Sequence, residues 1–182
     1  LGTLEASIRT FDPDNKQFHI DDLTLARAAV RLTRTSAGVR PTTVFGIDPD
    51  HLQIDALSLR AADIALSGTR WAADLQHTSF LEHGGLDLRE LSGAFAVDSV
   101  HAELADVTLE TAASRAHLDL VLTYGALSDL FDAPRMVGVR TTMSGSQIAL
   151  SDLLMLMPSL PVQHGSGVTV RCAFALAGTV QD

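Results

Sequence analysis

The chain is poor in the residues from which many compact binding sites are built. It has one cysteine, Cys172, and one lysine, Lys16, in 182 residues, and aromatic residues make up only 5%. A lone cysteine excludes an internal disulfide and most metal frameworks. A net charge of −9 without a basic stripe argues against nucleic acid as a partner. No apolar run reaches the roughly 18 residues of a transmembrane helix, so we expect no membrane span within this segment.

Patterns typical of catalytic or metal sites are also missing. His77 and His83 flank Glu82, but on a strand they would lie about 20 Å apart, too far for one metal ion. The phrase His83-Gly84-Gly85 resembles an oxyanion-hole loop, yet no G-x-S-x-G nucleophile elbow occurs anywhere in the chain. We therefore expect no enzyme, no catalytic residue, no cofactor and no metal site.

Aliphatic residues are abundant instead. Apolar residues make up 46% of the sequence, and with so few aromatics this surface is mostly Leu, Val, Ile and Ala. The chain starts at Leu1 in mid-pattern, without an initiator methionine or a signal peptide. We interpret residues 1–182 as a single β-rich segment of a larger protein.

The stretch from residue 85 to residue 124 shows how the apolar residues are arranged. Leu118, Leu120, Leu122 and Tyr124 run at strict period two. Side chains on a strand point to opposite faces in turn, so this row predicts a strand with one apolar face. Similar rows joined by short turns predict an antiparallel meander with one aliphatic side.

The segment from Phe18 to Leu32 has the same alternation, but its parity changes twice. The changes fall at Asp21-Asp22 and between Arg27 and Ala29. One extra residue in a strand exchanges its two faces, so each change predicts a bulge or a corner.

This segment recurs along the chain. Shifting it by 34 positions (52 minus 18) reproduces both parity changes, and it aligns Phe18 with Leu52, Ile20 with Ile54, Leu23 with Leu57, Leu25 with Leu59, Val30 with Ile64 and Leu32 with Leu66. A fainter third copy places Leu104, Val107 and Leu109 on Ile54, Leu57 and Leu59 at a shift of 50 (104 minus 54). Repeated strand–corner–strand units predict an elongated, stacked architecture.

Polar, Gly and Pro residues predict the loops and short helices between the expected strands. We expect a loop over 33–50, and a short helix followed by a Pro/Gly loop over 151–167, with Ser151-Asp152 capping the helix. A helical turn is expected at 126–130. Ser92-Gly93 is expected to break a strand, and 136–143 and 146–150 to form two separate strands.

Three phrases now support a resemblance. They are IDALSLRAADIAL (54–66), VTLETAASRAHLDLVLTY (107–124) and SQIALSDLLMLMPSL (146–160). Together with the segment from residue 18 onward, they resemble the AsmA-like superfamily, most closely its TamB-like members. The resemblance covers roughly residues 18 to 160 and rests on degenerate motifs, in which most positions are only apolar or polar.

The resemblance implies an all-β fold, an elongated, curled antiparallel sheet (a β-taco or half-pipe) with one or two short helical turns. It also implies a periplasmic location in a diderm bacterium, with the full-length protein anchored in the inner membrane. The implied function is phospholipid transport between the inner and outer membranes, outer-membrane protein assembly, or both. The implied partners are phospholipid acyl chains and, through parts outside this segment, an outer-membrane barrel protein.

The apolar rows are the candidate lining of a lipid groove. An acyl chain needs a dry aliphatic track, because each buried CH₂ contributes about 0.8 kcal/mol. The predicted lining residues are Leu52, Ile54, Leu57, Leu59, Ile64, Leu66, Leu104, Val107, Leu109, Leu118, Leu120 and Leu122, with Leu86, Leu88 and Phe95 in the same rows.

The same rows would also suit an ordinary closed core. In that alternative the chain is a structural or adhesive β-repeat module without a ligand. The segment itself is expected to be monomeric or paired through its sheet edges. The exposure of Leu118, Leu120 and Leu122 separates an open groove from a closed core.

Overall fold

The computed structural model describes residues 2–33, 51–132, 134–156 and 168–179. Of the loop expected over 33–50, Thr33 closes a strand and the remainder lies outside the described residues. The Pro/Gly part of 151–167, from 157 onward, lies outside them as well.

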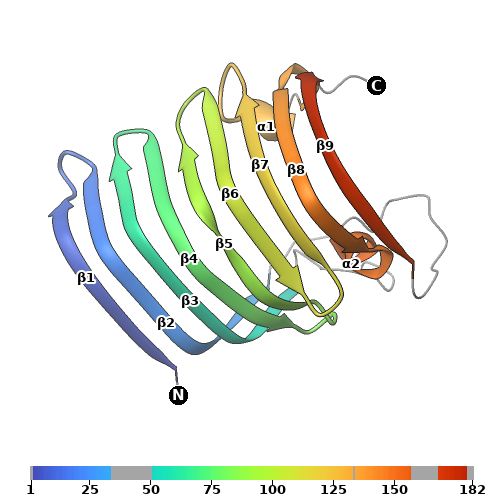
Figure 1. Cartoon of the computed structure of the whole chain (residues 1–182). Helices are drawn as coiled ribbons and strands as arrows, with labels where there is room; N and C mark the ends of the chain where they lie inside the picture. The colour runs from blue at the N-terminus through green and yellow to red at the C-terminus, as the bar shows by residue number, and fades with distance from the viewer. Residues whose placement is uncertain (1, 34–50, 133, 157–167, 180–182) are drawn as a thin grey trace.

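The described residues form one antiparallel sheet of nine strands, in which every strand pairs with the next one in sequence (Figure 1). The strands are β1 Thr3–Asp12, β2 Gln17–Thr33, β3 His51–Ser67, β4 Arg70–Glu82, β5 Asp87–Val97, β6 His101–Thr111, β7 Arg115–Thr123, β8 Gly138–Ala149 and β9 Thr169–Thr179. Short helices interrupt the meander near its C-terminal end, namely α1 Asp129–Asp132, the 3₁₀ helix η1 Pro134–Met136 and α2 Leu150–Leu156.

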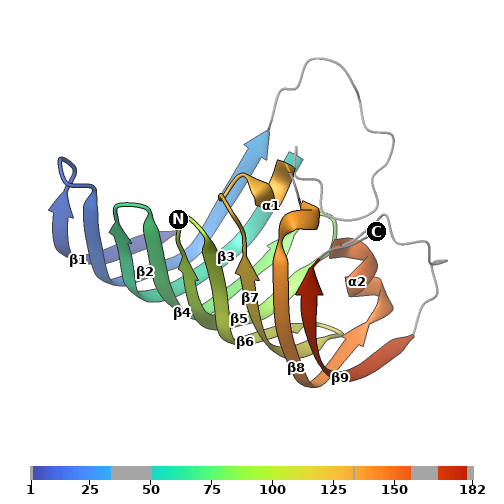
Figure 2. The same cartoon turned by 90° about the horizontal axis from the view of Figure 1, so that it is seen from above.

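The sheet curls along its strands, so that its cross-section is an open curve (Figure 2). This confirms the predicted all-β, half-pipe fold. The helix α1 follows β7 and α2 follows β8, so they lie at opposite ends of β8 and at opposite lips of the curve. In the part of the chain that the structure describes, no helix is long and apolar enough to cross a membrane.

The parity changes read from the sequence are β-bulges. The backbone has a positive φ at Arg27 (52°) in β2, at Ala56 (54°) and Asp63 (48°) in β3, and at Asp106 (52°) in β6. The pairing register shifts at the same places, for example between Leu25 and Ala28. A bulge inserts one unpaired residue and bends the strand. Each strand–corner–strand unit is therefore one long strand bent at its bulges.

The two segments related by the shift of 34 are the neighbouring antiparallel strands β2 and β3. Phe18 pairs with Leu66 and Leu32 pairs with Leu52, so the two long strands match in reversed order. The apolar pattern is nearly the same in both directions. The bulge of β2 at Arg27 thereby lies beside that of β3 at Ala56, and neighbouring strands bend together.

Three local predictions are wrong. Ser92-Gly93 does not break a strand: β5 continues through it, with a register shift and a φ of 142° at Gly93. A single strand, β8, replaces the two expected strands, because Gly145 (φ 53°) forms a bulge inside it. Asp152 does not cap a helix from outside, since α2 begins at Leu150. In each case a Gly or a polar pair predicts the end of a strand or helix, but the backbone hydrogen bonding of that element continues past it.

A small core lies at the end of the sheet near α1. Ala102, Tyr124 and Val137 are buried together, and Val97, Leu122, Leu130 and Val139 pack against them. The Tyr124 hydroxyl donates toward the Asp98 and His101 carbonyls, both at 2.9 Å. Among the described residues no large side chain is fully buried. The sheet is consequently a single open layer with local covers at its lips.

Candidate hydrophobic groove

The pairing register places the predicted lining residues on one face of the sheet. Leu120 of β7 pairs with Leu104 of β6, and Leu104 pairs with Phe95 of β5. Directly paired residues project from the same face, and the bulges keep the row on that face after each parity change. We call it the groove face, and the opposite one the outer face.

The same face continues across β2 and β3. Leu25 pairs with Leu59, Ile20 with Ile64, and Leu57 with Ala28. Ala61 of β3 pairs with Leu75 of β4, and so extends the row toward the middle of the sheet. The register therefore brings all the predicted lining residues together on the groove face.

Exposure differs along this face. Val107 is buried, at 5% exposure. Leu86 and Leu88 of the same rows are buried as well, at 4% and 5%. The other predicted lining residues, Leu118, Leu120 and Leu122 included, are neither buried nor fully exposed. A closed core would bury them, whereas a single layer leaves part of each side chain accessible. That they line a lipid track stays a prediction.

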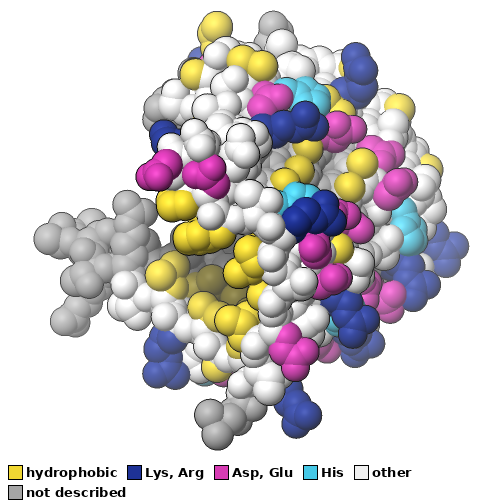
Figure 3. All heavy atoms as spheres, turned by 90° about the vertical axis from the view of Figure 1, so that its left-hand side faces the viewer, with side chains coloured by type: hydrophobic (Ala, Val, Ile, Leu, Met, Phe, Trp, Pro, Cys, Tyr) yellow, Lys and Arg dark blue, Asp and Glu magenta, His cyan; other side chains and the backbone are white. Residues whose placement is uncertain are grey.

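The groove is most open at its N-terminal edge. Leu4 and Ile8 of β1 are 68% and 59% exposed, and Phe11 packs edge-on against Phe18 with ring centroids 5.1 Å apart. Figure 3 looks onto this side and shows a hollow in which hydrophobic side chains gather. At the other edge, Phe174 of β9 is also exposed. Apolar surface thus runs out to both edges of the described sheet.

Basic side chains avoid the groove face. In the described strands the arginines stand between apolar positions, as Arg60 does between Leu59 and Ala61, or at bulges, as Arg27 does. Two carboxylates lie on or over this face. Glu82, opposite Ile54, is buried and accepts the Gly84 N–H. The other belongs to Asp152 of α2. The groove face therefore offers an aliphatic surface without a cationic partner for a phosphate.

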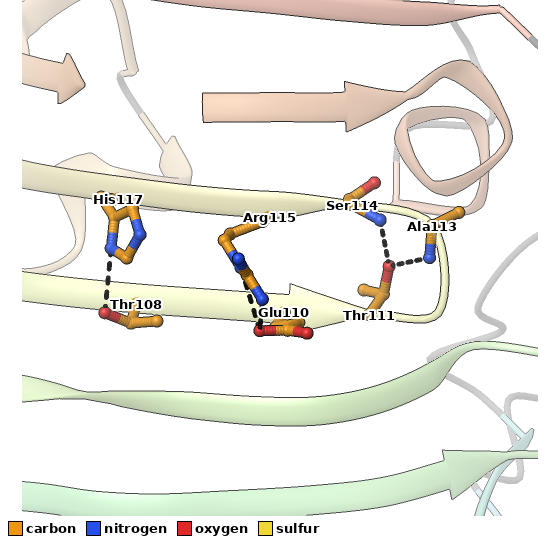
Figure 4. Close-up of polar contacts among 7 residues, drawn as sticks. All are labelled: Thr108, Glu110, Thr111, Ala113, Ser114, Arg115 and His117. Atoms are coloured by element: carbon orange, nitrogen blue, oxygen red, sulfur yellow. Dashed lines mark hydrogen bonds and ion pairs between the residues drawn. The ribbon is translucent and has the colours of Figure 1, made fainter. Parts of the chain in front are cut away.

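The outer face carries polar cross-strand pairs, which Figure 4 shows between β6 and β7. Thr108 Oγ1 lies 3.1 Å from His117 Nδ1, and the Arg115 guanidinium donates to Glu110 at 2.8 Å. At the turn between the same two strands, and on the groove side, Thr111 Oγ1 accepts the Ser114 N–H at 2.9 Å. Cross-strand side-chain pairs each add modest stability, and their polar groups make the outer face hydrophilic.

A carboxylate fixes the bulge of β6 on this face. Asp119 accepts the Asp106 N–H at 2.9 Å and the Thr142 hydroxyl at 2.8 Å. The Asp106 N–H above all, and then the Thr142 hydroxyl, lower the pKa of Asp119 below its ordinary value. A cavity of about 220 Å³ lies beside these residues, and its lining is largely polar. Val107 and Leu118 of the aliphatic row also line it, so the cavity lies at the β6 bulge between the two faces.

His77 of β4, weighed above together with His83 as a metal ligand, contacts Glu90 and Ser79. Its Nδ1 lies 2.6 Å from Glu90 Oε2, and its Nε2 lies 3.1 Å from Ser79 Oγ. A serine, an imidazole and a carboxylate in this order are parts of acyl-transfer sites. Here the His77 side chain is 40% exposed on the outer face, without the water-excluded setting that makes such groups reactive. We treat the trio as a surface hydrogen-bond network.

His19, Asp21 and Asp63 are the described side chains best placed to hold a metal ion. His19 Nε2 lies 3.4 Å from a carboxylate oxygen of each aspartate. Arg9 Nη2 already lies 2.6 Å from the same Asp21 oxygen, and its charge opposes that of a cation. We assign no metal to this cluster. Its contacts link side chains of β1, β2 and β3 on the outer face.

Sequence reasoning missed the polar contact that fastens α2. Ser114 Oγ donates to the Asp152 carboxylate at 2.6 Å, and the Thr111 hydroxyl donates to the same oxygen. Ser114 Oγ in turn accepts the Ala149 N–H at 2.9 Å. Asp152 is 41 and 38 positions from Thr111 and Ser114, and the three residues follow no motif spacing. The expected Ser151-Asp152 cap and the apolar run after it indicated a helix here, but not what the helix contacts.

Comparison of the chain with family models, with curated proteins and with solved structures found no match.

Proposed function

We propose that the groove face binds lipid acyl chains and that the chain serves phospholipid transport between the two membranes of a diderm envelope. One observation carries the proposal. The described strands present a continuous aliphatic face that no second layer of described residues covers, and apolar side chains stay exposed at its open edge. Exposed apolar patches of this extent mark binding surfaces in soluble proteins. The sequence resemblance to AsmA-like proteins agrees with this role.

The dimensions of the groove suit an acyl chain. Nine strands at a spacing of roughly 4.8 Å give a track about 38 Å long across the sheet. Each CH₂ that leaves water on this track contributes about 0.8 kcal/mol. A chain lying across several strands would therefore gain several kcal/mol without a single polar contact.

Charge then decides how the lipid lies. The groove face of the described strands has no arginine, and the nearest carboxylates, Glu82 and Asp152, would repel a phosphate. We infer that the head group stays in water at a lip while only the tails enter. Such a groove selects for tails and discriminates little between head groups.

The proposal is tested with a pair of charge substitutions on β3. Leu57→Glu places a carboxylate on the groove face, and Ser58→Glu places one on the outer face at the next residue. Native mass spectrometry of the purified chain should find co-purified phospholipid in the wild type and in Ser58→Glu, and much less in Leu57→Glu. Lipid-free wild type that also takes up no added fatty acid would favour the structural module without a ligand.

A second function of the same envelope class is assembly of outer-membrane proteins. It is favoured by the edge strands β1 and β9, each of which pairs on one side only among the described residues. An open edge can accept an incoming strand through backbone hydrogen bonds. Site-specific crosslinking from Ser7 of β1 in cells would show adducts with outer-membrane barrel proteins if this function operates. An inner-membrane anchor and a barrel partner belong to the same proposal, through parts outside this chain.

A further inference from the structure

Helix α2 covers one lip of the groove and is made mainly of aliphatic residues. Leu154 is 3% exposed, and the Met155 methyl carbon lies 3.3 Å from the position that a Cβ on Gly85 would take. The helix thus reaches from the end of β8 to the turn between β4 and β5. It lies over the groove face, because Thr111, which contacts it, pairs with Leu88 of the apolar row.

Part of the apolar row is buried beside this helix. Leu86, next to Gly85, is 4% exposed, and Leu88, opposite Thr111, is 5% exposed. Ala116, just beyond Ser114, is buried as well. At the β1 edge the same face is wide open. The part of the groove beside α2 is therefore occupied by the protein's own side chains.

Few polar contacts attach α2 to the sheet. Its polar anchor is the Asp152 carboxylate, which accepts the hydroxyls of Thr111 and Ser114 from the turn between β6 and β7. The helix has seven residues, and isolated helices shorter than roughly 12 residues are marginal in water. It is consequently held by packing on the groove face, by this carboxylate and by the Leu150 N–H, which donates to the Val168 carbonyl at 2.9 Å.

We propose that α2 is a displaceable stopper of the groove, an inference that rests on the proposed function. Leu154 and Met155 fill the place that an acyl chain would take at this lip, so helix and chain compete for one surface. A bound acyl chain lifts α2, and the bonds of Asp152 set how readily it leaves. Competition of this kind shifts an equilibrium by the difference in affinity for the two states.

The first measurement follows α2 in the wild-type chain. Hydrogen exchange of the amides of residues 150–156 is compared with and without saturating palmitate, with the amides of β2 and β3 as a folding check. Displacement predicts faster exchange in α2 when palmitate is bound. Slower exchange, or unchanged exchange with palmitate bound, overturns the stopper.

The second measurement weakens the anchor. Asp152→Ala removes the acceptor of both hydroxyls. Ser151→Ala is the control, because the exposed Ser151 hydroxyl makes only a long contact, 3.4 Å, with the other oxygen of that carboxylate. Hydrogen bonds to a charged group are strong enough that we expect roughly tenfold faster exchange in α2 and a severalfold tighter binding of a fluorescent fatty acid. Ser151→Ala should change neither. Faster exchange with unchanged affinity shows that α2 does not compete, and overturns the proposal.

The outcomes also separate this inference from the function on which it rests. If neither the wild type nor Asp152→Ala binds the fatty acid, both proposals fail. If the fatty acid binds and Leu57→Glu abolishes binding while α2 behaves identically with and without ligand, the groove stands and only the stopper fails. Should Asp152→Ala lose protection in β2 and β3 as well, Ser114→Ala, which removes one of the two hydroxyls, replaces it, with the same expected direction.

Discussion

Leu120→Glu tests whether the apolar row faces an open groove. Leu120 lies in the middle of the groove face and is partly exposed. Complete burial of a leucine side chain stabilises by about 1.5–3 kcal/mol, so the loss here should be about 1–2 kcal/mol. The new carboxylate can turn toward the water of the groove and avoids the desolvation cost of a buried charge.

Val107→Glu is the matched comparison in the same row. Val107 is 5% exposed, and its pairing partner Leu118 belongs to the same row. An unpaired charge placed at a buried position costs several kcal/mol, a large part of the roughly 5–15 kcal/mol that stabilises a whole domain. Leu120→Glu should therefore stay folded while Val107→Glu unfolds wholly or in large part.

Urea unfolding followed by circular dichroism measures both effects. At a slope of about 2 kcal/mol per molar urea, Leu120→Glu should lower the midpoint by roughly 0.5–1 M. Val121→Glu, one residue along on the outer face, should lower it less. Unfolding of Leu120→Glu as complete as that of Val107→Glu would refute the open groove. A folded Leu120→Glu that binds fatty acid like the wild type would refute the lining role.

Three further predictions concern local devices of the sheet. Hydrogen bonds hold the pKa of Asp119 below the ordinary aspartate value of 3.8, so its stabilising effect is present above that value and is lost as pH falls through the lower folded pKa. Carboxyl NMR should show this low midpoint, and Thr142→Val should raise it. Gly93→Ala should cost about 2 kcal/mol or more in thermal or urea unfolding, since φ is 142° and the new Cβ would lie 3.0 Å from backbone atoms, whereas Gly178→Ala, with open space around it, should be nearly neutral. Tyr124→Phe removes the donor to two carbonyls and should cost about 1 kcal/mol in the same assays; in the wild type, burial should move the spectroscopic midpoint of Tyr124 above 10.0.

The fold class was readable because alternation and parity are properties of the sequence itself. Two-residue periods in β3 and β7 indicated strands, and the parity changes at Asp21-Asp22 and after Arg27 coincide with bulges. The strand boundaries were harder. Gly93 and Gly145 end strands in many proteins, but here they sit at bulges, and the distinction depends on whether the neighbouring strand continues to pair. That information lies in the partner strand.

The membership of the apolar row could be predicted, but its exposure could not. Leu120 and Val107 have the same pattern in sequence, yet one is partly exposed and the other is buried. The difference comes from neighbours such as Gly93, whose missing side chain lets Val107 sit close to β5. The place of α2 was likewise out of reach, because its anchor, Asp152, bonds residues 38 and 41 positions away.

The strictly sequential order of the strands has a consequence for how the chain reaches this structure. Among the described residues, each strand pairs only with its neighbours in sequence, from β1 through β9. A hairpin can therefore add to a growing edge as soon as it is available, and no distant segment has to return and close the sheet. Folding can proceed from one end to the other in step with the delivery of the polypeptide. It also follows that removing one whole hairpin should shorten the sheet while the remaining strands keep their neighbours on either side of the cut.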